Sequence, residues 1–169
     1  MVNARKPSNS EPNNVLHRVQ RGLGAYISYL AACEMNESFS EYILYEPILR
    51  ILSARNFVVR CEYECPGITQ PKNGDKKRLD FYVTGNNVEF AMEVKWVKKN
   101  KPDVSRDVEK LQAFVAAKPG SLGLLCVFGR QSHIQDLQWG DEPLKERGKP
   151  IYNDLRRTKY GCRIYEITM

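Results

Sequence analysis

The sequence predicts an α/β domain with a mixed central β-sheet flanked by helices, in the order αβββαβ, with an extra N-terminal helix before that core. Two observations lead to this class. Residues 78–84 and 88–96 alternate apolar and polar side chains on either side of a short turn, which is typical of a β-hairpin. Segments with helical periodicity precede and follow the hairpin, and a short apolar run comes after the second of them.

Composition indicates one domain. The chain has 169 residues, of which 42% are hydrophobic, enough for one ordinary core, so we expect a single domain at 14–169 with its core at about 38–128. Residues 1–13 are polar and predict a disordered arm. No apolar run has the length of a membrane span or a signal peptide, so we expect a cytoplasmic protein with no membrane partner.

Two helices are expected before the first strand. Apolar residues recur at helical spacing over 14–33, and this helix is additional to the αβββαβ core. It covers a sheet edge, forms the seam of a homodimer, or packs within the monomer, which is the simplest expectation. The second helix is expected over 38–55, because Ser38 begins an S-x-x-E capping box. Pro47 predicts a kink or a restart of this helix.

The remaining elements follow from the same patterns. In chain order they are a strand at 57–65, the hairpin, a helix at 104–117 and a buried strand at 122–128. In the tail, residues 138–150 are expected to form a loop, and a final strand at 162–168 is expected to add to the sheet. On the helix at 104–117, Lys110 and Gln112 are expected to face either solvent or phosphate.

The register of the hairpin follows from its turn. Asn86 and Asn87 tolerate positive φ and form a two-residue turn, so Gly85 faces Val88. Counting outward gives one face made only of apolar pairs, which we expect to be core: Val83 with Phe90, Phe81 with Met92, and Leu79 with Val94.

The other face of the hairpin carries charge. It places Asp80 opposite Glu93, with Lys95 two residues further along. Facing Cβ atoms are only about 4.5–5.5 Å apart, so the two carboxylates repel each other unless a cation offsets them. Mg²⁺ is often held by one or two carboxylates, waters and phosphate oxygens. The pattern therefore favours a Mg²⁺ (or Mn²⁺) site in which Lys95 orients an attacking water or balances charge, and the alternative is a solvated surface.

The segments RLDFYV and FAMEVKWVKK resemble the PD-(D/E)XK, or restriction-endonuclease-like, nuclease superfamily over about 38–128, with Leu79 in place of the motif's proline. Spacing and the following lysines are distantly similar to archaeal Holliday-junction resolvases. The resemblance implies a restriction-endonuclease-like core and these roles: metal ligands Asp80, Glu93 and Val94, catalytic lysine Lys95, and helix carboxylate Glu46. Glu41 is a rival for the last role.

The net charge of +6 is concentrated near one end of the hairpin. Basic residues lead into Asp80 and follow Lys95, where a nucleic-acid backbone would lie: Lys76, Lys77, Arg78, Lys98, Lys99 and Lys101. We therefore expect DNA as partner and metal-dependent endonuclease activity, the hydrolysis of DNA phosphodiester bonds. The alternatives are a nucleic-acid-binding protein of the same fold that does not cleave, and a protein-interaction module such as an immunity or assembly factor.

Overall fold

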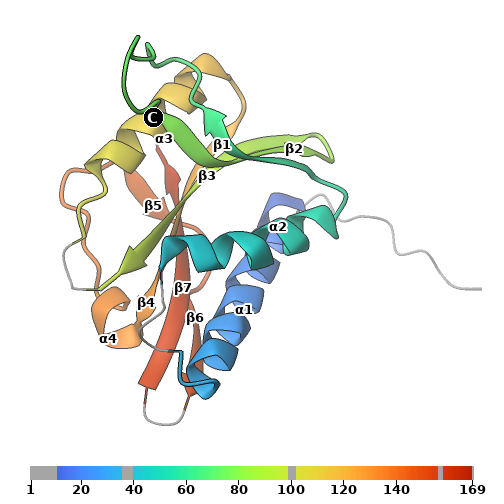
Figure 1. Ribbon diagram of the computed structural model, residues 1–169, viewed down its shortest axis with the longest axis vertical. Coiled ribbons are helices and arrows are strands. Elements are labelled where there is room, and N and C mark those ends of the chain that lie inside the picture. Colours follow the sequence, from blue (N-terminus) through green and yellow to red (C-terminus); the bar gives the residue numbers. More distant parts are fainter. Residues whose placement is uncertain (1–10, 36–39, 99–101, 156–157, 169) are drawn as a thin grey trace, which may run out of the picture.

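The computed structural model describes residues 11–35, 40–98, 102–155 and 158–168, in which a seven-stranded mixed sheet is flanked by helices (Figure 1). The strands are β1 (Val58–Glu64), β2 (Arg78–Gly85), β3 (Val88–Val97), β4 (Leu122–Arg130), β5 (Leu144–Glu146), β6 (Ile151–Leu155) and β7 (Thr158–Ile167). The helices are α1 (Glu11–Ala32), the 3₁₀ helix η1 (Glu41–Leu44), α2 (Tyr45–Ser53), α3 (Ser105–Ala117) and α4 (Gln131–Ile134).

The strand order is β1-β2-β3-β4-β7-β5, and β6 pairs with β7 beside β5. Only β3 and β4 are parallel, and α3 makes the crossover between them. All other neighbours are antiparallel. The prediction of an α/β domain with a mixed sheet flanked by helices is confirmed, and α2, β1 to β3, α3 and β4 follow one another in the expected order.

The sheet has an apolar core on each face. Helices α1 and α2 cover one face of the sheet (Figure 1). The core on this face includes Val19 and Ile27 of α1, Ile48 of α2, and Phe81, Phe90 and Phe128 of the strands. Helices α3 and α4 cover the other face, where the packed residues include Val108, Leu111, Phe114, Leu125, Ile134 and Tyr165. The hairpin therefore lies between two helical layers; Phe81 and Val83 are buried on the side of α1 and α2, whereas Asp80, Tyr82 and Thr84 of the same strand are only partly buried.

The additional helix packs within the monomer. Helix α1 begins at Glu11, three residues before the expected start, and contacts α2, β6 and β7. Gly22 allows its close approach to α2, because a Cβ atom there would lie 2.5 Å from Cδ1 of Ile51. None of the described helices is both long and apolar enough to cross a membrane.

The predicted restart of the helix over 38–55 occurs, but at Tyr45 and not at Pro47. The chain forms η1 first, and α2 then starts at Tyr45, two residues before Pro47. Proline lacks an N–H, and its ring clashes with the carbonyl four residues earlier, so a continuous α-helix cannot run through Ile43. Ser38 lies outside the described residues; Ser40 occupies the N-cap position of η1 and makes no side-chain capping bond.

The loop predicted over 138–150 forms except at β5, and β6 is an additional strand that was not predicted. Strands β5 and β6 pair with successive halves of β7, which lies between them and β4. The final strand begins at Thr158, four residues before the expected start at Cys162. Strand β5 has only three residues, of which two are charged, so its sequence carries no alternation to reveal it.

Candidate active site

The hairpin turn forms as expected. Asn86 and Asn87 have φ values of 52° and 60°, the left-handed conformation that their short polar side chains tolerate. Gly85 pairs with Val88, and the register continues to Phe81 and Met92. The predicted register is therefore confirmed over this part of the hairpin.

Beyond Phe81 the strands separate, and Asp80 lies at this point. Strand β2 pairs with β3 no further than Phe81, and its pairing with β1 passes over Asp80, from Phe81 to Leu79. On β1, the residue that the register places opposite Asp80 is Glu62, whose φ of 52° is left-handed. This break in the regular strand conformation interrupts the alternation of side chains.

The interruption overturns one prediction. Leu79 was expected to face Val94 within one apolar layer. Leu79 instead packs on the α3 side of the sheet, whereas Val94 packs on the side of α1 and α2. Across the break at Glu62 and Asp80 the side chains of β2 change face, since Phe81 packs with Val94 and Leu79 does not, and two-residue alternation in the sequence carries no sign of this change.

Asp80 and Glu93 lie beside each other, as the sequence predicts. The N–H of Val94, released from the β2–β3 ladder, donates to Oδ2 of Asp80 at 2.7 Å. The N–H of Asp80 donates to Oε1 of Glu93 at 3.4 Å. The hydroxyl of Tyr45, at the start of α2, lies near the Asp80 carboxylate and lowers its pKa, against the effect of burial. Backbone N–H groups thus orient both carboxylates.

Lys110 of α3 reaches this pair. Its Nζ lies 2.5 Å from Oε2 of Glu93 and donates to the carbonyl of Arg78 at 3.1 Å. The side chain of Glu93 is only 3% exposed and that of Lys110 only 15%. Lys110 therefore faces the carboxylates and is largely buried, so the expectation that it faces solvent is wrong, while contact with phosphate stays a prediction. Gln112, on the same helix, is exposed.

Lys95 connects to the same residues through Asp107. Its Nζ lies 3.2 Å from Oδ2 of Asp107 and 4.0 Å from Oε1 of Glu41. Asp107 Oδ1 is 3.4 Å from Nζ of Lys110. These contacts form one continuous set of charges, called here the carboxylate–lysine cluster: Glu41, Asp80, Glu93, Lys95, Asp107 and Lys110.

The structure places Glu41, not Glu46, in this cluster. Oε1 of Glu41 accepts the N–H of Trp96 at 3.1 Å, which holds the carboxylate beside β3. Glu46 lies on the outer face of α2, where it pairs with Arg50 and its side chain is 56% exposed. The switch from η1 to α2 produces this difference, because a 3₁₀ turn and an α-turn direct their side chains differently.

Burial and like charge act together on the two hairpin carboxylates. Burial raises the pKa of Asp80, against the opposing effects of the Tyr45 hydroxyl, the Val94 N–H and Lys110. Burial and the neighbouring Asp80 raise the pKa of Glu93 well above its ordinary value, and Lys110 opposes this rise. Both carboxylates therefore ionise less readily than in water, so further positive charge at this position would stabilise their ionised forms.

The two lysines stay protonated. Burial lowers the pKa of Lys110, but Glu93 and Asp107 outweigh this effect and leave it raised. Burial likewise lowers the pKa of Lys95, and Asp107 and Glu41 leave it raised. Both side chains are therefore fixed positive charges at neutral pH, and neither is a general base in this state.

The predicted nucleic-acid-binding residues lie around the same end of the hairpin. Arg78 and Lys98 are exposed where β2 starts and β3 ends. Lys76 is exposed and pairs with Glu64, while the backbone of Lys77 is bound to the side chain of Gln70. Two further predicted residues, Lys99 and Lys101, lie outside the described part of the chain.

The hairpin carboxylates fit a hard divalent ion in their chemistry, since both supply oxygen ligands and two carboxylates suffice for Mg²⁺. Oε2 of Glu93 contacts Lys110, so an ion there competes with this ammonium. Across the described residues, no three His, Cys, Asp or Glu side chains are grouped to hold a metal.

Comparison with protein-family models, curated proteins and solved structures gave no match to this chain.

Two residues of the site, Tyr45 and Asp107, were not singled out from the sequence, and the position of Lys110 beside Glu93 was not predicted. The spacing of Asp107 and Lys110 by one helical turn puts them on one side of α3, beside the buried Val108 and Leu111. Acidic and basic residues at this spacing are equally typical of a solvated helix surface, so only the docking of α3 onto the hairpin reveals their role.

Proposed function

We propose that the chain is a metal-dependent endonuclease that hydrolyses DNA phosphodiester bonds, with a restriction-endonuclease-like core. The observation that carries the proposal is an excess of carboxylates where β2 and β3 separate. In the described part of the cluster, four carboxylates accompany two ammonium groups. Two of these carboxylates, Asp80 and Glu93, have raised pKa values, so the site favours additional positive charge.

Chain order and local geometry support the proposed core. A helix, a three-stranded antiparallel unit, a crossover helix and a parallel strand follow one another, and the acidic pair lies on the central hairpin. The superfamily resemblance implies a helix before the hairpin that bears a glutamate, and Glu41, 4.0 Å from Lys95, is the candidate for this role in place of Glu46. The alternation of side chains in the hairpin, the hydrogen bonds of Asp80 and Glu93, and the charges of the carboxylate–lysine cluster therefore all support the same candidate site.

Each residue has a proposed role. Asp80 and Glu93 supply oxygen ligands for Mg²⁺ or Mn²⁺, and Val94 takes part through its backbone, which already orients Asp80. When bound, the metal supplies Lewis-acid polarisation of a phosphoryl oxygen and a more acidic water. Lys95, held by Asp107, stabilises negative charge on the reacting phosphate. Tyr45 orients the Asp80 carboxylate.

Cleavage assays on plasmid, branched and single-stranded DNA, with Mg²⁺ or Mn²⁺ and with chelator, test the proposal. Asp80→Asn, Glu93→Gln and Lys95→Met should each reduce cleavage by at least a hundredfold. Glu46→Gln is the matched control, since Glu46 is exposed and paired with Arg50, and it should cut at the parent rate. Metal-dependent cleavage that persists unchanged in Asp80→Asn and Lys95→Met rules out this site.

A second function has one specific observation in its favour. Lys110 already neutralises Glu93 at 2.5 Å, in the position where a metal would compete. A protein of this fold that binds nucleic acid without cleaving it needs no metal, and such a lysine would complete its charge balance. DNA binding by the parent protein with no cleavage in either metal identifies this alternative.

A further inference from the structure

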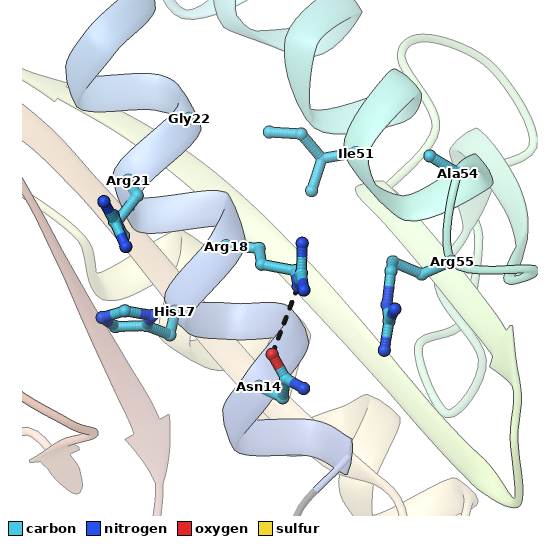
Figure 2. Close-up of a pocket in the computed structure, with 8 residues that line it drawn as sticks. All are labelled: Asn14, His17, Arg18, Arg21, Gly22, Ile51, Ala54 and Arg55. Carbon is cyan, nitrogen blue, oxygen red and sulfur yellow. Dashed lines mark hydrogen bonds between the residues drawn. The ribbon is translucent and has the colours of Figure 1, made fainter. Parts of the chain in front are cut away.

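A groove between α1 and α2 gathers positive charge outside the carboxylate–lysine cluster (Figure 2). Its volume is about 580 Å³, and its nitrogen-bearing side chains include His17, Arg18, Arg21 and Arg55. None of the described residues that line it is acidic. A concave surface with this charge raises the local concentration of anions.

The helices hold the arginines close together. Gly22 permits the close approach of α1 to Ile51 of α2. The side chains of Arg18 and Arg55 extend into the space between the two helices (Figure 2). Arg18 Nε donates to Oδ1 of Asn14 at 3.2 Å, which fixes the guanidinium and uses one of its five donors. The other donors of Arg18 can therefore bind an anion.

A second hollow lies on the other side of His17, which lines both. Its basic residues come from the segment around β5: Lys145, Arg147 and Lys149. Two acidic residues also line it, and each has an arginine partner. Glu146 binds Arg163 at 2.7 Å through both of its oxygens, and Glu166 pairs with Arg147. The exposed lysines therefore determine the charge of this hollow.

The side chain of Gln20 brings a buried hydrogen-bond donor to this hollow. Its side chain lines the hollow and the residue is only 2% exposed, yet its Nε2 has no hydrogen-bond partner within the described residues. A buried amide donor without an acceptor is costly, and in native proteins such a group usually has a partner. An anionic oxygen in the hollow would accept this hydrogen bond.

We propose that the two hollows together bind the phosphate backbone of a nucleic acid, as a contact region separate from the cleavage site. The cations of this basic band are Arg18, Arg21, Arg55, Lys145 and Lys149, and His17 lies between the two hollows. A band that crosses both sides of α1 offers more cationic side chains than one small anion needs, which favours a ligand with successive phosphates. The inference rests on the proposed function for the identity of the ligand.

Helix α2 connects the band to the active site. Tyr45 at its start contacts Asp80, and Ala54 just beyond its end lines the groove. At 1.5 Å per residue this helix spans roughly 14 Å. That distance corresponds to about four base pairs of duplex, at 3.4 Å for each. A duplex cut at Asp80 therefore needs only a few further base pairs to reach Arg55.

The test is the binding of a fluorescently labelled duplex three helical turns long, measured by anisotropy in chelator over a range of salt concentrations. The band variant is Arg18→Ala/Arg21→Ala/Lys149→Ala, in which all three residues are exposed. The control variant removes the same charge from exposed cations elsewhere: Arg60→Ala/Arg130→Ala/Lys159→Ala. A third variant, Gln20→Met, removes the buried amide without changing the charge.

We expect the band variant to bind at least tenfold more weakly, with a log-log salt slope smaller by about two to three units, since each phosphate contact contributes about 0.9. The control should stay within twofold of the parent, and Gln20→Met should weaken binding while folding normally. Equal losses in the band and control variants, or parent affinity in the band variant, overturn the proposal. Chelator prevents cleavage, so this result is independent of whether Asp80→Asn abolishes hydrolysis.

Discussion

Replacing Lys110 with methionine tests the charge balance of the site most directly. Methionine keeps most of the apolar stem of lysine and removes the ammonium that lies 2.5 Å from Glu93. Glu93, whose side chain is 3% exposed, would then lie beside Asp80 with no cation in contact. The change therefore isolates one charge in a buried set.

The expected magnitude follows from burial. Breaking a buried ion pair by removing one partner costs about 3–5 kcal/mol of unfolding free energy. For a chain of this size each kcal/mol corresponds to about 2–4 °C in Tm, so metal-free Lys110→Met should melt roughly 6–20 °C below the parent. Lys118→Met is the matched control, because Lys118 pairs with the more exposed Glu89 and such surface pairs contribute only about 0–1 kcal/mol.

Adding metal gives the second half of the test. A divalent ion at Asp80 and Glu93 must displace Lys110 in the parent but meets no competitor in Lys110→Met. At equal Mg²⁺ or Mn²⁺ concentration, the variant should therefore gain more in Tm than the parent. Calorimetric melting of parent, variant and control, each with chelator and with metal, gives the necessary values. Equal gains in parent and variant would refute metal binding at Glu93, and an unchanged metal-free Tm would refute the importance of the ion pair.

Two further predictions concern the same end of the hairpin. Burial raises the pKa of Asp80, so its ionised form weakens the fold at neutral pH, and metal-free Asp80→Asn should melt at or above the parent temperature. At a hundredfold excess over Kd, metal stabilises the parent by about 2.7 kcal/mol, and melting with metal should show that Asp80→Asn loses most of this gain. Charge reversal of the lysines that flank the hairpin should weaken DNA binding equally for all sequences. In binding titrations, the log-log slope of affinity against salt concentration should fall by about one unit for each lost phosphate contact. The lysines to reverse are Lys76, Lys77, Lys98, Lys99 and Lys101.

Short-range patterns predicted most of the elements. Alternation over 78–84 and 88–96, with two asparagines between them, was enough to give the hairpin and its register as far as Phe81 and Met92. Such patterns depend on neighbours within a few residues, and they are strong wherever one face is buried. Strands β5 and β6 were not predicted, because they are short and carry polar residues, and because their pairing with β7 depends on tertiary contacts.

The site was harder to predict than the hairpin that carries it. Asp80, Glu93 and Lys95 followed from the sequence, but the left-handed Glu62 and the resulting position of Leu79 did not. The backbone break at Glu62 lies in β1, so the alternation of apolar and polar residues in the sequence of β2 does not reveal it. The choice between Glu41 and Glu46 likewise depended on where η1 ends and α2 begins, which the predicted kink or restart at Pro47 did not fix.

The same break explains why carboxylates are found at this position. Where β2 and β3 separate, the N–H of Val94 has no partner strand, and the Asp80 carboxylate accepts its hydrogen bond in place of a carbonyl. Buried backbone donors need an acceptor, so an acidic or amide side chain at residue 80 has a structural role as well as a chemical one. Asn can accept this bond and Ala cannot. Asp80→Asn therefore separates the charge of Asp80 from its hydrogen bond, whereas Asp80→Ala removes both together.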